Sequence, residues 1–150
     1  MYEYSCRILR VVDGDTVDVD IDLGFGIWKK KERIRLYGID TPESRTSDKE
    51  EKIYGNYAKQ VVECWLPVGT MQTLVTQKDE SGKYGRILGQ FKVYDMHSGK
   101  DIILNEWMIE NHIGVKYHGQ SKEDVEAEHL ENRKNVNLDL GFLLSEEKEE

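Results

Sequence analysis

Three short stretches of the chain carry residues that together could hydrolyse a phosphodiester bond. They are residues 13–16 (Asp-Gly-Asp-Thr), residues 35–43 (Arg-Leu-Tyr-Gly-Ile-Asp-Thr-Pro-Glu) and residues 83–86 (Lys-Tyr-Gly-Arg). Carboxylate oxygens are the ligands that hard divalent cations prefer, and arginine holds phosphate through a planar fork that is always charged. These residue types therefore indicate metal-assisted chemistry on a phosphate ester.

Each stretch also has a plainer explanation when it is taken alone. Asp-Gly pairs are common in hairpin turns, so residues 13–16 could form a turn and nothing more. Asp40 could cap a turn, Glu43 could be solvated, and Arg35 could pair with a surface acid. Residues 83–86 could be an ordinary turn with a cationic edge. The chemistry therefore depends on the fold bringing the three stretches together.

Alternating apolar residues predict the strands that would position these stretches. Residues 16–23 alternate strictly between apolar and polar side chains, which is typical of a half-buried strand. Further strands are expected at residues 32–39, 71–77 and 86–94, and one more precedes residue 13, so the chain predicts about five antiparallel strands. The acidic members of the alternation are expected on a solvated strand face; they are Asp18, Asp20 and Asp22.

Apolar residues at helical spacing predict three helices. The first contains residues 58–65, follows Tyr54 and Gly55, and ends before Pro67, which cannot continue a helix. The second opens at Leu104, and the third opens at Ser121 with a sequence that resembles a capping box. All three are expected to pack against the strands.

The order of the three stretches and the elements around them resemble the staphylococcal nuclease family, over about residues 5–130. The resemblance implies a mainly β (α+β) fold, a five-stranded antiparallel OB-type barrel with about three helices packed on it. The domain is expected over residues 1–144. The charged end, residues 145–150, is expected to be disordered.

The resemblance also implies roles for individual residues. Asp15 and Asp40, with the backbone carbonyl of Thr41, would bind one Ca²⁺ ion. Glu43 would be the general base, and Arg35 would hold the phosphate as charge grows in the transition state. In this family the product carries a 3′-phosphate.

Further residues are assigned on the same resemblance. Arg86 would be the second catalytic arginine. Asp13 would support the metal site, and Lys83, Tyr84 and Tyr117 would contact the substrate beyond the scissile bond. The remaining titratable candidates are histidines without metal-ligand spacing, expected to be surface or satisfied side chains: His97, His112, His118 and His129.

Composition limits these interpretations. The chain has 150 residues, 38% of them hydrophobic, which fits one domain. Its 21 basic and 29 acidic residues give a formal net charge of −8, so a nucleic-acid site requires a local positive field. Two cysteines cannot form a disulfide framework, and no apolar run suits a leader or a membrane span. A cytoplasmic monomer is expected; secretion after leader removal stays open.

The function predicted from these residues is a Ca²⁺-dependent endonuclease of low sequence specificity, acting on DNA and in extension on RNA. One alternative is a non-catalytic OB-fold module that binds single-stranded nucleic acid or a protein partner. Another is an acidic Ca²⁺-binding protein. The segment 16–35 is longer than in the best-known family member, and its Phe25, Trp28 and residues 29–31 could form an arm for single strands. The favoured interpretation is a solvated hairpin whose Trp28 covers the core.

Overall fold

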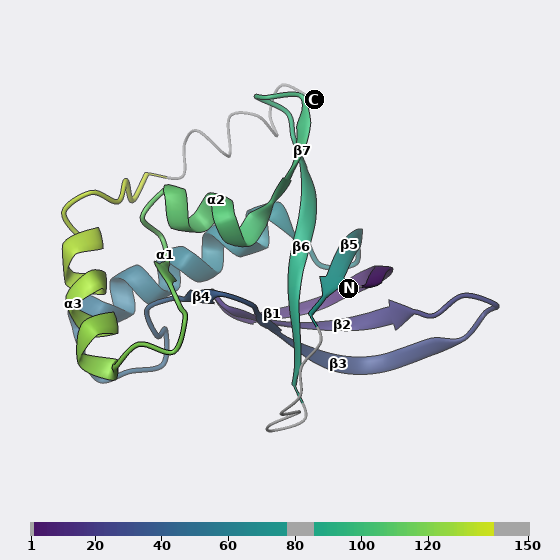
Figure 1. Ribbon diagram of the computed structural model, residues 1–150, viewed down its shortest axis with the longest axis horizontal. Helices are drawn as coiled ribbons and strands as arrows, with labels where there is room; N and C mark the ends of the chain where they lie inside the picture. The colour runs from purple at the N-terminus through teal and green to yellow at the C-terminus, as the bar shows by residue number, and fades with distance from the viewer. Residues whose placement is uncertain (1, 78–85, 140–150) are drawn as a thin grey trace.

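A curled β-sheet carries the fold (Figure 1). The computed structural model describes residues 2–77 and 86–139, and within them the main sheet has the strand order β3-β2-β1-β5-β6-β7. β3 also pairs in parallel with β6, where Ile34 lies opposite Ile87, so the sheet turns back on itself as an OB-type fold does. Its strands are β1 (Tyr2–Asp13), β2 (Thr16–Asp22), β3 (Trp28–Leu36), β5 (Met71–Thr76), β6 (Ile87–Asp95) and β7 (Lys100–Ile103).

This architecture confirms the predicted fold class, with one strand more in the main sheet than the sequence predicted. The additional strand, β7, pairs with β6 and leads directly into a helix. Its four residues are too few to show an alternating pattern, which is why the sequence did not predict it. None of the helices in the described part of the chain is long and apolar enough to cross a bilayer.

The inner face of the sheet holds the core, as the alternation predicted. Val17, Val19 and Ile34 are fully buried there beside Phe91 from β6. The prediction of a solvated acidic face is wrong for Asp20, which is buried and whose carboxylate accepts a hydrogen bond of 2.8 Å from the backbone of Lys31. That bond holds a bulge in β3 opposite Asp20, since the register shifts at this point.

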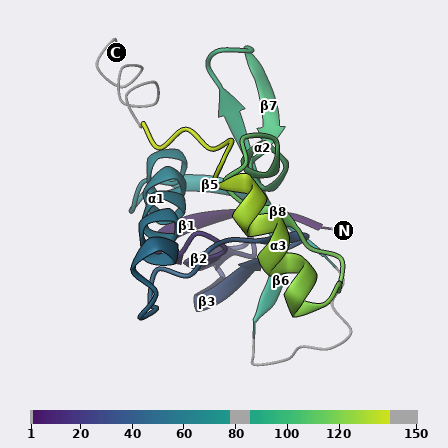
Figure 2. The same ribbon diagram turned by 90° about the vertical axis from the view of Figure 1, so that its left-hand side faces the viewer.

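Three helices lie on one side of the curled sheet within the described residues (Figure 2). α1 spans Lys49–Trp65 and begins well before the predicted start, because the Asp48 side chain accepts hydrogen bonds from two backbone N–H groups of the first turn. Gly55 therefore lies inside α1 and does not precede it. α2 (Leu104–Glu110) opens at Leu104 as predicted.

α1 and α2 meet through two aromatic side chains at the edge of the core. The rings of Trp65 and Trp107 contact each other edge to face, with centroids 5.1 Å apart. The neighbouring Cys64 is half-buried, and Cys6 on β1 is buried; both are free thiols. Burial raises the pKa of the Cys6 thiol to about 12.

α3 (Lys122–Asn132) begins where the capping box predicted, since the Ser121 hydroxyl accepts a hydrogen bond from the Asp124 backbone. The helix buries none of its residues, so polar contacts attach it to the rest of the molecule. The Asn132 side chain donates to the Gly114 carbonyl at 3.2 Å, and Arg133 pairs with Glu50 of α1 at 3.6 Å.

A small second sheet brings the chain between α2 and α3 beside the loop after β3. β4 (Ile39–Asp40) pairs with β8 (Val115–Lys116), and the Tyr117 backbone donates to the Gly38 carbonyl at 2.8 Å. Gly38 has a φ of 76°, a conformation that favours glycine, so the chain can turn sharply between β3 and β4.

The hairpin between β2 and β3 extends away from the body of the molecule (Figure 1). Phe25 is fully exposed at its tip, between Gly24 and Gly26. Trp28 is not among the side chains that pack on the core, contrary to the favoured prediction. Its ring instead contacts the cations of Arg7 and Lys30, at 5.2 Å and 5.3 Å from the ring centroid.

Candidate catalytic site

The turn between β1 and β2 places two carboxylates at one end of the sheet. A Cβ on Gly14 would lie 2.9 Å from the Thr41 hydroxyl and 2.8 Å from the Ala58 side chain, so only glycine lets the turn pack this closely. Asp15 is fixed locally, because its Oδ1 accepts a hydrogen bond of 3.0 Å from the Thr16 hydroxyl. The close packing joins residues 13–16 to the loop that follows β4.

The guanidinium of Arg35 gathers the two predicted metal ligands. Its Nη2 lies 3.5 Å from Oδ2 of Asp15 and 3.6 Å from Oδ1 of Asp40. Its Nη1 donates to the backbone carbonyls of Leu36 at 2.9 Å and Ile39 at 2.8 Å. Only 16% of the Arg35 side chain is exposed, and its planar guanidinium is held in an orientation in which Nη2 faces both carboxylates.

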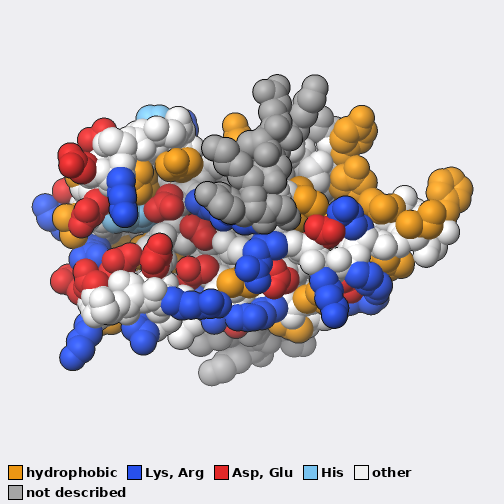
Figure 3. Space-filling model, turned by 90° about the horizontal axis from the view of Figure 1, so that it is seen from below, with side chains coloured by type: hydrophobic (Ala, Val, Ile, Leu, Met, Phe, Trp, Pro, Cys, Tyr) orange, Lys and Arg blue, Asp and Glu red, His pale blue; other side chains and the backbone are white. Residues whose placement is uncertain are grey.

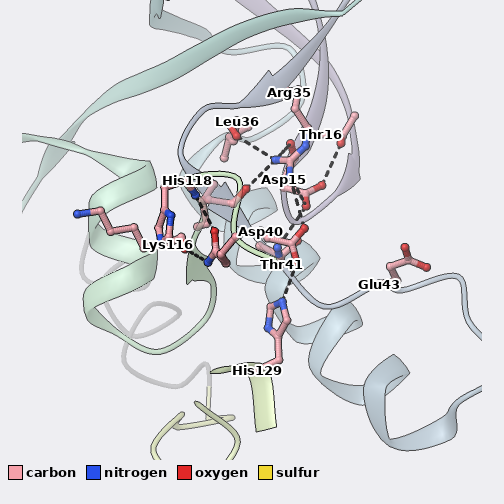
Figure 4. A network of polar contacts seen from close by, with 12 residues as sticks. Asp15, Thr16, Arg35, Leu36, Asp40, Thr41, Glu43, Lys116, His118 and His129 are labelled. Carbon is pink, nitrogen blue, oxygen red and sulfur yellow. Dashed lines mark hydrogen bonds and ion pairs between the residues drawn. The ribbon is translucent and has the colours of Figure 1, made fainter. Parts of the chain in front are cut away.

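Asp40 has a second partner that the sequence did not predict. Oδ2 of Asp40 lies 2.7 Å from Nε2 of His129 on α3, and Figure 4 shows the ring directed at the carboxylate. Nδ1 of His129 is buried and has no hydrogen-bond partner among the described residues, which assigns the ring proton to Nε2, the donor to Asp40. The two residues are 89 positions apart in the sequence, so no spacing signal predicted this pair.

Two oxygens next to this cluster are buried without a hydrogen-bond partner in the described part of the chain. They are Oδ1 of Asp13 and the hydroxyl of Thr41. The Thr41 backbone is engaged, since its N–H donates to Oδ2 of Asp15 at 3.2 Å. Burial raises the pKa of Asp13, hydrogen bonding with Ser44 lowers it, and the charge of Asp15 adds to the rise, with a net increase.

Glu43 lies at the margin of the cluster. It is exposed, and in Figure 4 its carboxylate stands apart from those of Asp15 and Asp40. The loop that carries it is held by α1, because the Glu43 backbone donates to the Glu51 carboxylate at 3.3 Å. A Cβ on Gly55 would overlap the Glu43 carbonyl, so the absence of a side chain at Gly55 allows this approach.

Of the remaining predicted residues, Arg86 and Tyr117 are described, and within the described residues the cavity that Arg86 lines contains no residue of the cluster. Arg86 immediately precedes Ile87, whose partner in β3 is Ile34, so the two predicted catalytic arginines come from neighbouring strands. Arg86 lines a surface cavity of about 350 Å³. The half-exposed Tyr117 is joined to the loop before Asp40 through its backbone. Lys83 and Tyr84 fall in the segment 78–85, outside the described residues.

The donor set suits a hard cation. Asp15 and Asp40 offer carboxylate oxygens beside one guanidinium nitrogen, and the two unpartnered oxygens of Asp13 and Thr41 lie next to them. In residues 2–77 and 86–139 no three His, Cys, Asp or Glu side chains converge as a complete metal site. A cation here would therefore need oxygen ligands beyond the side chains, such as backbone carbonyls, water or a phosphate.

The sequence matches the family described as "Staphylococcal nuclease homologue" over residues 33–137. This range contains Arg35, Asp40, Glu43 and Arg86, and it begins after Asp15.

Three relatives show how far individual similarities extend. The probable endonuclease LCL3 of Yarrowia lipolytica is 32% identical over 95 residues, covering 63% of this chain and 40% of that protein. The thermonuclease of Staphylococcus hyicus is 33% identical over 86 residues, covering 57% and 47%. Protein ParB of Escherichia coli is 37% identical over 87 residues, covering 58% and 41%. The chain therefore spans less than half the length of these curated relatives.

Proposed function

This chain belongs to the staphylococcal nuclease family, and from that premise we propose that it is a Ca²⁺-dependent endonuclease of low sequence specificity. We propose DNA as its main substrate and RNA as a further one, with products that carry 3′-phosphates. The proposal is carried by one observation: the carboxylates of Asp15 and Asp40 lie beside the same nitrogen of Arg35. Like charges held this close to a single cation suit a site that receives a second cation and an anionic substrate.

Arg35 orients the site and binds the phosphate. Two backbone carbonyls accept hydrogen bonds from its Nη1, so the plane of the guanidinium is set before substrate arrives. Its Nη2 faces the carboxylates at distances longer than a strong hydrogen bond, which leaves it able to turn to a phosphate oxygen. Charge-assisted hydrogen bonds to that oxygen would strengthen as negative charge accumulates in the transition state.

Asp15, Asp40 and the Thr41 carbonyl would hold the Ca²⁺ ion. The ion would supply Lewis acidity at the phosphoryl oxygen and charge neutralisation. His129 donates to the Oδ2 oxygen of Asp40, so that carboxylate is fixed in orientation. Asp13 adds negative charge beside Asp15, and its raised pKa reflects how poorly its burial suits the ionised form.

Glu43 is the proposed general base. An exposed carboxylate can accept a proton from water without first breaking an ion pair, and Glu43 forms no ion pair within the described residues. The closely packed contact between its loop and Gly55 of α1 fixes the loop's position. Arg86, which immediately precedes β6, would add the second guanidinium on the phosphate.

The test is cleavage of denatured and duplex DNA, and of RNA, with Ca²⁺, with Mg²⁺ and with chelator. We expect Ca²⁺-dependent cutting, with end analysis showing 3′-phosphates. Glu43→Gln should lower the rate about 10²- to 10⁴-fold, the usual contribution of general acid–base catalysis. Glu63→Gln, at an exposed position of α1, is the matched control and should leave the rate unchanged.

Arg35→Lys keeps the positive charge and removes the planar guanidinium, so it tests the geometry of the hydrogen bonds separately from the charge. It should lose most activity while circular dichroism confirms that the protein is folded, because lysine cannot form paired hydrogen bonds to phosphate. A folded wild-type protein that binds Ca²⁺ and oligonucleotide but cuts no substrate would overturn the proposal and favour the non-catalytic OB-fold module.

A further inference from the structure

A row of basic side chains lies beside the candidate site on the outer face of β1, β2 and β3. Cross-strand pairing orders this face into rows. Asp13, Thr16 and Arg35 lie opposite one another in the first row, which is the candidate site. The second row, Arg10–Asp18–Arg33, follows on the same face. Asp18 and Arg33 are alternate residues of β2 and β3, and a register shift in β1 before Asp13 aligns Arg10 with them. Along β2 and β3 each row lies two positions from the next, a distance of about 7 Å.

A third row continues the pattern toward the hairpin. Arg7 lies opposite Asp20, and Asp20 faces the bulge that contains Lys30 and Lys31. The second and third rows together hold five cationic side chains and two carboxylates. This part of the surface is therefore locally positive in a chain whose formal net charge is −8. Figure 3 shows Lys and Arg side chains along the middle and right of the view, whereas most of the acidic side chains lie on the left, where some basic ones are interspersed.

Not all of these cations are engaged within the protein. Arg33 holds Asp18 through two hydrogen bonds of 2.8 Å and 3.1 Å, and Lys30 pairs with Asp20 at 3.4 Å. The side chains of Arg10 and Lys31 have no ion pair or hydrogen bond within residues 2–77 and 86–139. They can bind an external anion without losing an internal partner.

The two available cations border a hollow in the surface. It has a volume of about 400 Å³ and is lined by Leu9, Arg10, Asp18, Lys31 and Arg33. Arg33 is two residues from Arg35 along the same strand, so the hollow adjoins the candidate site on the same face of the sheet. An extended chain with regularly spaced phosphates could therefore contact the site and the hollow together.

We infer that this hollow is a phosphate-binding subsite for the part of a nucleic-acid strand that extends beyond the scissile bond. The inference rests on the proposed function for the identity of the strand. Arg10 and Lys31 provide the charge, and Arg33, fixed by Asp18, provides a planar donor at the side nearest Arg35. The subsite supplies the local positive field that an acidic nuclease needs to retain a polyanion.

The test compares two double variants in a Glu43→Gln background, so that the probe is not consumed. Arg10→Gln with Lys31→Gln removes the charge of the hollow, and Lys100→Gln with Lys122→Gln removes two exposed charges elsewhere. The probe is a labelled single strand of about 12 thymidylates, within the length that OB-type surfaces bind. We expect about tenfold weaker binding for the first variant alone. The slope of log K against log salt should also fall by about 0.7 for each phosphate that the variant no longer neutralises.

Cleavage of a dinucleotide, too short to reach the hollow, separates the subsite from the function. The Arg10→Gln, Lys31→Gln variant with Glu43 intact should cut the dinucleotide at the wild-type rate. Unchanged oligonucleotide binding, or equal weakening by the control pair, would overturn the subsite while leaving the function in place. Failure of that variant to cut the dinucleotide would also overturn it, because the two cations would then belong to the catalytic site. A wild-type protein that cuts neither the dinucleotide nor long single-stranded DNA would count against the proposed function itself.

Discussion

At the scale of a single residue, Asp13 belongs to the proposed site but its ionised carboxylate lowers the stability of the fold. Its carboxylate lies beside that of Asp15 and is partly removed from water, and burial is the main reason that its pKa is raised. A raised pKa in the folded state means that folding disfavours the ionised form. The protonated Asp13 side chain therefore favours the folded state. Its stabilising contribution is fully present below the pKa of the unfolded chain, about 3.9, and is lost as the pH rises through the pKa of the folded protein.

Asp13→Asn should therefore be more stable than the wild type at pH 7, and the difference should disappear as pH falls to about 4. Urea unfolding at both pH values measures this. Asp101→Asn, at an exposed position of β7, controls for the removal of one charge. An advantage for Asp13→Asn that stays constant or grows toward low pH would contradict the assignment of burial as the cause.

The residue types of the site could be predicted from the sequence, but several of their contacts could not. Asp15, Arg35 and Asp40 stood out because carboxylates and arginine occur in short stretches with turn residues. His129 did not, because the histidines have no metal-ligand spacing in the sequence and its partner Asp40 lies on another element. The sequence also could not show that Arg35 is fixed by carbonyls of its own strand end.

At the scale of elements, α3 is unusual because none of its residues is fully buried. His129 contacts Asp40, and Arg133 contacts Glu50 and the ring of Tyr54, at 5.2 Å from its centroid. The contacts of His129 and of Arg133 can therefore be removed separately. Only the His129 contact acts on a proposed Ca²⁺ ligand, which is Asp40.

His129→Ala should weaken Ca²⁺ binding about tenfold, because hydrogen-bonded partners of ligating carboxylates usually contribute this much. Isothermal titration calorimetry measures the affinity without any cleavage. Arg133→Ala is the matched control, since it weakens the docking of α3 but leaves Asp40 its partner. Equal weakening in both variants would show that α3 as a whole, and not the His129 contact, is responsible.

α1 positions the Glu43 loop through the missing side chain of Gly55. A Cβ there would lie 2.6 Å from the Ser44 nitrogen and overlap the Glu43 carbonyl, so either the loop or the helix must move. The clash should outweigh the gain in helix propensity of about 1 kcal/mol that alanine brings.

Gly55→Ala should therefore lower the free energy of unfolding by about 1–2 kcal/mol and reduce cleavage further than the smaller folded fraction explains. Denaturant unfolding and initial rates at full folding measure the two effects. Asn56→Ala, at an exposed position of the same helix, should be neutral or slightly stabilising. Wild-type cleavage by folded Gly55→Ala would show that the Glu43 loop does not depend on this contact.

Strands were more predictable than helix boundaries. Strict alternation located β2, and its inward residues are buried, although the outward Asp20 is buried as well. The predicted start of α1 is too late because the periodic apolar residues begin only at Ala58, whereas Asp48 caps the helix ten residues earlier. Helix ends depend on capping hydrogen bonds, which apolar periodicity does not report.

At the scale of the whole molecule, the arrangement of charge matters more than its total. The chain is acidic, yet the register of β1, β2 and β3 collects cations into adjoining rows beside the site. This arrangement could not be predicted from composition, because a shift of one residue in pairing would move each side chain to the other face. The predicted arm in residues 16–35 was close in sequence to this surface, but the available cations come from β1 as well as β3.

The placement of the tryptophans gives the molecule two independent fluorescence signals. The chain contains three, and Trp65 and Trp107 contact each other between α1 and α2, where their emission reports the packing of the helices. Trp28 lies against Arg7 and Lys30 on the basic face, so a bound polyanion that withdraws those cations would change its emission. A Trp65→Phe, Trp107→Phe protein would thus report ligand arrival, and a Trp28→Phe protein would report unfolding.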